Sequence, residues 1–405
     1  MDILDVLTDL ENVVPFFQPI FSADEHRIIG YEILGRYHSP DSGVVSLGPF
    51  FLDSQIPEEY RLEVDNTVLI KALNKSLMLE KDMLLFINRD ADILMLDDGE
   101  QFLEQILQFS KQGISPDRIV LEISARNYIG ELEHLDHLLN YYRTYGIKIA
   151  FDKIGDDSSH LDRIGQLSPD ILKVNLQVLR STAAGAAYRD ILYSLSLLAR
   201  KIGATLLFEN IETSFQLQFA WKNGGHYYQG YYLCPPEEEF SPRNILKEKL
   251  RGECHSFILS EKKKLEQLFS LTNDLQERIQ DLLAKMKKQQ SYAELLRSLS
   301  GGLEGIAFRM YICDEDGFQL SPNLFRNIRE WELQSAYIEK NWSWRPYFLE
   351  NIIRMRYGKK GILSDRYSDI ETGEIIRTFS CPLADKDFLF VDLSSTYLYS
   401  REGML

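Results

Sequence analysis

Short apolar runs, each ending in a polar side chain, recur along the first 230 residues of the chain. They occupy residues 84–88, 119–122, 147–152, 171–173, 205–209 and 227–229. Apolar runs without polar alternation are typical of strands buried on both faces of a parallel sheet. Most of these runs are separated by segments long enough for a helix and two loops. The pattern therefore predicts a repeat of β-strands and α-helices.

The polar residue that closes each run predicts the place of a functional site. A parallel barrel gathers the C-terminal ends of its strands on one face, so residues distant in sequence meet in one pocket. That pocket would contain Asn88, Glu122, Asp152, Lys173, Glu209 and Gln229. A single polar residue after a strand is usually a cap or a solvated turn. Successive strand ends that all carry carboxylate, amide or ammonium groups favour a shared site instead.

The start of the chain follows a different pattern. Residues 1–15 place apolar and acidic side chains on opposite faces of an amphipathic helix, which we expect to end at Pro15. Residues 16–21 and 28–36 then have the pattern of two strands joined by a short polar turn. A turn of that length fits an antiparallel hairpin better than a βα-unit, so the barrel would begin irregularly.

Composition and charge limit the class of protein. A chain of 405 residues exceeds the usual size of one domain, which predicts two domains with separate cores. The net charge of -16 argues against binding of nucleic-acid polymers, which requires many cationic side chains. The four cysteines lie far apart, no secretion signal is visible, and no apolar run approaches the roughly 20 residues that span a bilayer. We therefore expect a cytoplasmic protein without membrane insertion.

Residues 246–300 are rich in Leu, Lys, Glu and Gln and contain no proline, which predicts a helical linker. Apolar positions in it recur at heptad spacing, with one threonine among them: Leu265, Leu268, Thr272, Leu275, Ile279, Leu282 and Met286. Two interpretations remain open for this stripe. It could pack on the chain's own domains, or it could form the seam of a helical dimer.

Residues 301–405 contain short strand-like segments and turns, which predict a small α+β domain. Hairpins are expected around residues 314–317 and 369–373, further strands over 379–383 and 388–393, and a helix starting within 341–348. Arg345 stands among aromatic residues, so this domain could bind a small polar ligand. The alternative is a core lined by Trp and Tyr in which Arg345 is neutralised by an acid.

The segment from Gln18 to Arg36, with the tripeptide Glu32-Ile33-Leu34, resembles the opening of the EAL-domain family of bacterial cyclic di-GMP phosphodiesterases. The later motifs of that family have counterparts in the same order: Leu121-Glu122-Ile123-Ser124, Asp152-Lys153-Ile154-Gly155, Asp170 to Asn175, Glu209-Asn210-Ile211-Glu212, and Gln229-Gly230-Tyr231 with Pro235. The resemblance implies an EAL domain over residues 1–245, folded as a modified TIM-type (β/α)8 barrel. Residues 301–405 resemble a PAS- or Cache-like sensor domain.

The resemblance also implies roles for individual residues. The first metal would be bound by Glu32, Asn88, Glu122 and Asp152, all oxygen donors suited to Mg²⁺ or Mn²⁺, with Ca²⁺ a candidate inhibitor. The catalytic residues would be Lys173, Glu209 and Gln229. Residues implied to bind cyclic di-GMP are Gln18, Glu32, Leu34, Arg36, Asn88, Asp152, Glu212 and Pro235. For Arg36, whose planar fork matches a phosphate, the alternative is a surface ion pair.

Four departures from the family pattern bear on activity. Lys153 replaces the second aspartate of the Asp-Asp-Phe-Gly loop, and Ala125 stands where a bracing glutamate is usual. Asn175 and Asn210 replace an aspartate and a glycine. Because Lys153 cannot ligate a cation as an ammonium, we expect binding of cyclic di-GMP with one cation and weak or lost hydrolysis. The alternative is a fully active phosphodiesterase regulated by the C-terminal domain.

A homodimer is also expected. The apolar stripe at heptad spacing favours it, and the resemblance to the EAL family implies it.

Overall fold

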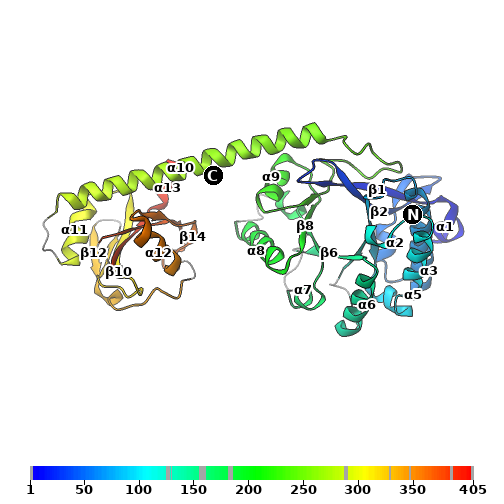
Figure 1. The fold of residues 1–405 in the computed structure, drawn as a ribbon, viewed down its shortest axis with the longest axis horizontal. Helices are drawn as coiled ribbons and strands as arrows, with labels where there is room; N and C mark the ends of the chain where they lie inside the picture. The colour runs from blue at the N-terminus through cyan, green and yellow to red at the C-terminus, as the bar shows by residue number, and fades with distance from the viewer. Residues whose placement is uncertain are drawn as a thin grey trace. The chain divides into compact units, whose positions relative to one another are not determined.

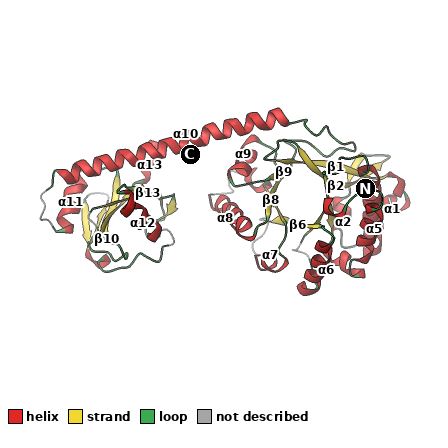
Figure 2. Cartoon of the chain, in the orientation of Figure 1, coloured by secondary structure: helices red, strands yellow, loops and turns green. Residues whose placement is uncertain are grey.

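The computed structural model describes residues 3–124, 128, 130–154, 161–180, 186–286, 291–327, 330–345, 348–383 and 386–402. The chain divides into two compact units, residues 1–257 and 258–405. The division falls inside the long helix α10 (Lys247–Ala284), within the stretch expected to form a helical linker. Figure 1 shows the path of the chain through each unit, and Figure 2 shows their helices and strands.

The described residues of the first unit form a closed barrel of eight strands. These are β1 (Val13–Ser22), β2 (Ile28–Ser39), β4 (Leu84–Arg89), β5 (Ile119–Ile123), β6 (Lys148–Ile154), β7 (Ile171–Asn175), β8 (Thr205–Glu209) and β9 (Tyr227–Tyr228). Strand β1 is antiparallel to both β2 and β9, and the other neighbours around the barrel are parallel. The short strand β3 (Gly43–Ser46) pairs with the outer edge of β2. The modified (β/α)8 barrel and its irregular hairpin start are thus confirmed.

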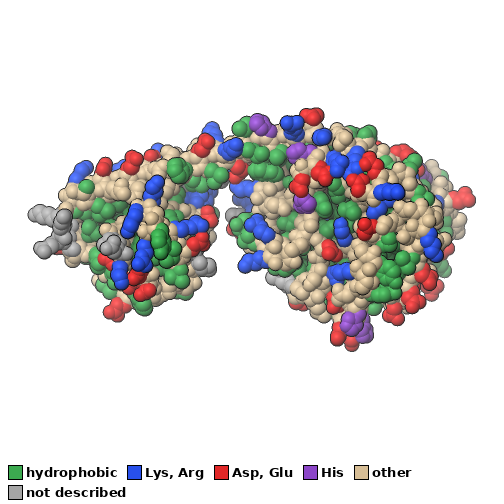
Figure 3. Space-filling view, in the orientation of Figure 1, with side chains coloured by type: hydrophobic (Ala, Val, Ile, Leu, Met, Phe, Trp, Pro, Cys, Tyr) green, Lys and Arg blue, Asp and Glu red, His purple; other side chains and the backbone are tan. Residues whose placement is uncertain are grey.

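Helices surround the strands of this barrel in Figure 1. The longer ones are α3 (Glu58–Ser76), α5 (Glu100–Ser110), α6 (Leu132–Thr144), α7 (Leu161–Leu167), α8 (Ala186–Ile202) and α9 (Ser214–Lys222). Shorter helices are α1 (Ile3–Thr8), α2 (Gly48–Leu52) and α4 (Ala91–Leu94), with 3-10 turns at Leu10–Asn12, Met95–Asp97, Pro116–Arg118 and Gln177–Arg180. Apolar side chains of strands and helices pack into one large core. Figure 3 shows acidic and basic side chains interspersed over the visible face of this unit.

The prediction of one helix over residues 1–15 was wrong at its end. Helix α1 stops at Thr8, a 3-10 turn follows, and β1 already begins at Val13. Pro15 lies inside β1, opposite Gly35 of β2. The β-branched side chains of Val13 and Val14 favour extended backbone. Proline is accepted in a strand where its nitrogen is not needed as a donor.

The alternation of side chains in the barrel strands explains why each apolar run ends in a polar residue. Side chains along a strand point alternately inward and outward. The inward positions deeper in the barrel form a separate apolar cluster of Ile20, Phe86, Val120, Ala150, Ile171 and Leu207. Two residues further along, the same inward positions of the parallel strands carry Asn88, Glu122, Asp152, Lys173 and Glu209. The apolar layer therefore closes the barrel below a polar layer.

The second unit contains a six-stranded antiparallel sheet in the order β12-β11-β10-β17-β16-β13. Its strands are β10 (Ala307–Asp314), β11 (Asn323–Arg326), β12 (Trp331–Gln334), β13 (Ile362–Leu363), β16 (Thr378–Pro382) and β17 (Asp387–Leu393). A separate hairpin joins β14 (Tyr367–Ser368) to β15 (Ile375–Ile376). The helical elements are α11 (Tyr292–Gly302), a 3-10 turn at Ser335–Tyr337, α12 (Phe348–Gly358) and α13 (Ser395–Glu402). The expected small α+β domain is therefore present.

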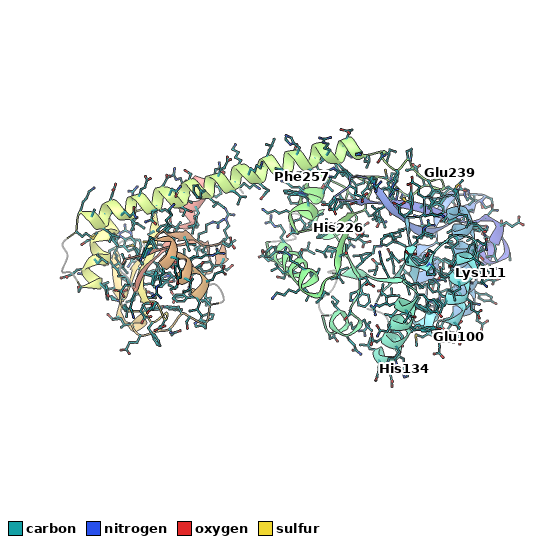
Figure 4. The ribbon with its side chains drawn as sticks, in the orientation of Figure 1. Glu100, Lys111, His134, His226, Glu239 and Phe257 are labelled. Atoms are coloured by element: carbon teal, nitrogen blue, oxygen red, sulfur yellow. The ribbon has the colours of Figure 1, made fainter. Side chains whose placement is uncertain are left out.

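Helix α10 contributes to the cores of both units. Near its start, Leu250 and Phe257 belong to the core of the barrel, and Phe257, labelled in Figure 4, packs against Trp221 with ring centroids 5.9 Å apart. Near its end, Leu275 and Ile279 are buried in the core of the second unit. The second half of the heptad stripe therefore packs on the chain's own domain. In the described part of the chain, every helix is too short or too polar to cross a lipid bilayer.

Candidate functional site

The C-terminal ends of the barrel strands open into a pocket of about 590 Å³. Predicted site residues that line it are Gln18, Glu32, Leu34, Arg36, Asn88, Glu122, Asp152, Glu209 and Gln229. Lys173 is fully buried and contacts the carboxylates of this set from the barrel interior. Glu212 and Pro235 do not line the pocket: the backbone of Glu212 is bound by Gln216, and Pro235 is exposed.

Lys173 stands at the centre of a group of carboxylates contributed by different strands. Its Nζ donates to Glu122 Oε2 at 2.7 Å and to Glu32 Oε2 at 3.1 Å, and lies 3.6 Å from Glu209 Oε2. Burial by itself would lower the pKa of Lys173, but the charges of these carboxylates and of Asp152 raise it well above its usual value. In the absence of a bound cation, the surrounding carboxylates therefore favour the ammonium form of Lys173, which offsets part of their negative charge.

The carboxylates respond differently to the same surroundings. Burial, followed by the neighbouring charge of Glu32, raises the pKa of Glu122 well above its usual value. Burial also acts to raise the pKa of Glu32, but Lys173, Asn88 and Gln229 stabilise its ionised form and lower the pKa overall. The lowered pKa of Glu32 means that its surroundings favour the ionised carboxylate.

Side-chain amides fix both oxygens of Glu32. Asn88 Nδ2 donates to Glu32 Oε1 at 2.7 Å, and Gln229 Nε2 donates to Glu32 Oε2 at 2.6 Å. Gln229 Nε2 also donates to Gln18 Oε1 at 3.0 Å, while Gln18 Nε2 donates to the carbonyl of Cys234 at 3.5 Å. Strands β1, β2 and β4 and the residue that follows β9 are thereby linked through one chain of polar side chains, which orients Glu32 toward the pocket.

Two buried oxygens of the site have no hydrogen-bond partner among the described residues. They are Oε1 of Glu122 and Oε1 of Gln229. A buried acceptor without a partner is costly, so such atoms indicate a place for a ligand, water or ion. In the described part of the chain, no three His, Cys, Asp or Glu side chains already converge as a ready-made metal site. The oxygen-rich donor set nevertheless fits a hard cation, with Glu122 Oε1 as an available ligand atom.

Arg36 lies at the pocket edge, and within the described residues it forms no ion pair. Its Nη1 donates to the carbonyl of Gly35 at 2.9 Å and to Ser46 Oγ at 3.3 Å, and its guanidinium lies 5.8 Å from the centre of the Phe16 ring. The described residues therefore do not contain the surface ion pair that was the alternative interpretation of Arg36.

Two of the departures from the family pattern contact each other. Asn210 has a φ angle of 56°, a left-handed conformation that asparagine tolerates better than most residues, and this accounts for asparagine at a glycine position. Its Nδ2 donates to Asn175 Oδ1 at 3.1 Å, which bridges the ends of β7 and β8. Ala125 and the side chain of Lys153 lie outside the described residues.

Several lining residues were not predicted from the sequence. They are Arg61, Asp65, Arg89, Asp90, Ser124, Asn175, Gln177 and Asn210. Arg61 and Asp65 come from a helix, not from a strand end. A signal was available: they share one face of α3 with the buried Val68 and Leu69, and charged residues on a buried helix face are unusual.

A family model for the EAL domain matches residues 2–236, and a model described as an EAL-domain associated signalling protein domain matches residues 240–405. Because the first match covers more than half of the chain, the chain belongs to the EAL-domain family. The C-terminal region matches a domain that is itself associated with EAL domains.

Individual relatives agree with this assignment. The chain is 52% identical over 407 residues to the uncharacterised EAL-domain containing protein YkuI of Bacillus subtilis, with 100% of both chains covered. A crystal structure of YkuI in complex with its substrate cyclic di-GMP and calcium superimposes with a TM-score of 0.94. The probable cyclic di-GMP phosphodiesterase PdeG of Escherichia coli is 28% identical over 238 residues, which cover 55% of this chain and 44% of PdeG. The structure of an EAL-domain protein from Listeria monocytogenes is 22% identical to this chain and superimposes with a TM-score of 0.51. The match covers 59% of this chain and 94% of the Listeria chain, and it shows a shared fold.

Proposed function

We propose that this protein binds cyclic di-GMP with one divalent cation as a signalling protein of the EAL phosphodiesterase type, with weak or lost hydrolysis to the linear dinucleotide. The observation that carries the proposal is the 590 Å³ pocket, which unites Arg36 with an oxygen-rich set of strand-end residues. Arginine suits a phosphate and carboxylates suit a hard cation, so the two parts match a metal-dependent phosphodiester ligand. The complex of YkuI with cyclic di-GMP and calcium supports the same ligand.

A cation would be held by Glu32, Asn88, Glu122 and Asp152. When bound, Mg²⁺ or Mn²⁺ supplies Lewis-acid polarisation of a phosphodiester. The chain's own residues would do the rest. Lys173 and Glu209 would hold and move protons beside the scissile bond, and Gln229 would orient Glu32, to which it donates. Calcium, present with cyclic di-GMP in the YkuI complex, would permit binding while disfavouring turnover.

Contacts to the dinucleotide would come from the pocket edge. Arg36 would meet a phosphate, Leu34 would offer an apolar surface, and Gln18 would support the site through its bond to Gln229. Glu212 and Pro235 would act from outside the pocket wall, since neither lines it. Lys153 and Ala125 are the sequence features that favour weak or lost hydrolysis.

A fully active phosphodiesterase regulated by the C-terminal domain is the second candidate. It is favoured by the assembly of the strand-end residues around one pocket and by the similarity to the probable phosphodiesterase PdeG. The two candidates predict different turnover of cyclic di-GMP, so one sample can distinguish them.

The test is calorimetric titration of cyclic di-GMP with Mg²⁺, Mn²⁺ or Ca²⁺, followed by chromatography of the same samples for the linear product. We expect binding in every metal and little or no product. Glu32→Ala should abolish metal-dependent binding, because it removes a ligand and the partner of Lys173. Glu133→Ala on the exposed face of α6 is the matched control and should bind normally. Rapid product formation in Mg²⁺ or Mn²⁺ would contradict weak or lost hydrolysis and favour an active phosphodiesterase, and no binding in any metal would refute both candidates.

A homodimer is the proposed assembly, with α10 as the expected contact. Leu259, Leu265 and Phe269 of that helix are large apolar side chains that are 54%, 65% and 69% exposed. Burying such side chains against a second copy would remove them from water. We expect light scattering at micromolar concentration to give twice the chain mass, and Leu265→Lys with Phe269→Lys to lower it. A monomeric mass for the unmodified protein would contradict the proposal.

The C-terminal domain would act as the PAS- or Cache-like sensor. Between α12 and the sheet lies a small cavity of about 20 Å³ lined by Tyr311, Arg345, Asn351, Ser364, Thr378 and Ser380, with Phe348 and Phe390. The Arg345 guanidinium lies 4.6 Å from the centre of the Trp342 ring, which supports the packed alternative, since a cavity of this size holds little more than one water molecule. A small polar ligand of this domain would enter here only if α12 moves outward.

A further inference from the structure

Helix α12 of the second unit has one face buried in the domain and one face turned outward. Phe348, Ile352 and Met355 are buried, and they belong to a core cluster that they share with side chains of the sheet. Their spacing is that of one side of a helix, so the residues on the opposite side point into solvent. A helix packed in this way normally carries polar side chains on its outward face.

The outward face of α12 carries large apolar side chains instead. Leu349, Ile353 and Tyr357 follow one another at intervals of four residues, which places them in a row along the helix. They are 58%, 49% and 83% exposed. A single exposed apolar residue needs no explanation, but a row of them on one helix face indicates a contact surface.

Basic side chains flank this apolar row. Arg354 and Arg356 are 65% and 51% exposed, and the exposed Lys359 and Lys360 follow the end of the helix. Residues 349–366 hold five basic and two acidic side chains, although the whole chain has a net charge of -16. Figure 3 shows basic and apolar side chains on the visible face of this unit. The row therefore lies within a local excess of positive charge.

Nearby carboxylates offset only part of that positive charge. Arg354 pairs with Glu350 at 2.6 Å. Glu315 is shared between Arg356 and Lys386, each at 3.1 Å. Exposed ion pairs of this kind are weak and are screened by salt, so these cations can exchange their partners for an anionic surface.

A second copy of the chain matches this face poorly. In a two-fold dimer the same patch would meet itself, so its basic flanks would face each other. Three side chains on a convex helix face also offer far less than the roughly 800 Å² per partner of a standard protein interface.

A lipid bilayer matches the face better, because it needs no complementary groove. Apolar side chains of a helix that lies on a bilayer enter the headgroup region, and tyrosine favours the boundary between lipid and water. Arginine and lysine beside them reach the headgroups, where anionic lipids attract positive charge.

We propose that the outward face of α12 binds the surface of an anionic lipid bilayer, with Leu349, Ile353 and Tyr357 in the headgroup region and the flanking cations on lipid phosphates. Such a helix lies on the bilayer and does not cross it. The inference is independent of the proposed function, because this face belongs to the second unit and needs neither cyclic di-GMP nor a cation.

The experiment is sedimentation of the full chain with vesicles, in the presence of a chelator and without cyclic di-GMP. One set of vesicles contains equal parts of phosphatidylglycerol and phosphatidylcholine, and the other contains phosphatidylcholine alone. We expect binding to the anionic vesicles that weakens as salt rises, and little binding to the neutral ones.

Two double variants separate the apolar and the basic contributions. Ile353→Gln with Tyr357→Gln should lower the partition coefficient about 10-fold, because two apolar side chains no longer enter the bilayer. Arg354→Gln with Lys360→Gln should lower it about 10- to 30-fold, because two positive charges are lost. Glutamine preserves the helix propensity of α12, and all four side chains are exposed, so the variants should fold.

The matched controls make the same changes elsewhere. Leu77→Gln with Met78→Gln removes two side chains that are 41% and 74% exposed after α3. Lys262→Gln with Lys263→Gln removes two exposed charges of α10. Both controls should bind anionic vesicles as the intact protein does.

Failure of the intact protein to bind anionic vesicles would overturn the inference, and so would equal binding by the α12 variants. A lower mass of Ile353→Gln with Tyr357→Gln in light scattering, without vesicle binding by the intact protein, would assign the face to a second copy. Retention of the intact protein on poly-glutamate, again without vesicle binding, would assign it to an acidic polypeptide.

Discussion

Replacing Lys173 with methionine is expected to lower the free energy of unfolding of the metal-free protein by about 3–5 kcal/mol, the usual cost of removing one partner from a buried ion pair. Lys173 is fully buried, and its ammonium bonds Glu32 and Glu122 while lying close to Glu209. Without it, the carboxylates would be left close together in the barrel with no cation. Urea denaturation at neutral pH in the presence of a chelator measures the loss.

The same variant should respond more strongly to divalent cations than the intact protein does. Mg²⁺ or Mn²⁺ would then supply positive charge that the ammonium no longer provides, and ligand binding to the native state raises stability. Lys111→Met is the matched control, because Lys111, labelled in Figure 4, is exposed. Equal stability of Lys173→Met and Lys111→Met would show that the carboxylates do not depend on the lysine.

Replacing Arg309 with methionine is expected to destabilise the second unit by about 3–5 kcal/mol for the same reason. The buried guanidinium donates to Asp392 and Asp369, both at 2.6 Å, and to Glu371 at 2.8 Å. It thereby ties the adjacent strands β10 and β17 to the β14–β15 hairpin. Removing it leaves two buried carboxylates unpaired. Hydrogen exchange of the β10 and β17 amides should accelerate, while exchange in the barrel strands stays unchanged.

Two further variants test this interpretation. Arg354→Met removes an exposed arginine of α12 that pairs with Glu350, and its effect should stay within about 0.5 kcal/mol. Adding Asp392→Asn to Arg309→Met removes one of the unpaired charges and should recover part of the stability. If the double variant is less stable than Arg309→Met, unpaired charge is not the cause of the loss.

Much of the barrel was predictable because each strand has a sequence pattern that can be recognised from a few consecutive residues. Buried parallel strands are continuous apolar runs, and the inward alternation makes their last residue polar, so Asn88, Glu122 and Glu209 could be placed in one pocket from sequence alone. The end of the first helix could not be placed as well. Proline is found both at helix ends and at strand positions whose nitrogen needs no hydrogen-bond partner, so Pro15 did not distinguish the two.

The rest depends on tertiary contacts. Arg61 and Asp65 enter the pocket only because α3 packs beside the strand ends, and the bonds of Lys173 depend on which carboxylates the closed barrel brings near it. Strands β11 and β12 are short and carry polar residues, so their place in the sheet follows from pairing with β10 and with each other. The hairpin around residues 369–373 was predicted, since its turn residues signal it directly.

The sharing of α10 between two cores limits the modularity of the protein. Domain boundaries usually fall in exposed linkers that few contacts cross. Here the EAL match ends at residue 236, yet Leu250 and Phe257 of α10 still belong to the barrel core. The same unbroken helix then supplies Leu275 and Ile279 to the second unit. A barrel recombined with a different C-terminal domain would therefore have to bring its own stretch of α10, so the exchangeable unit is larger than the region that the EAL family model matches.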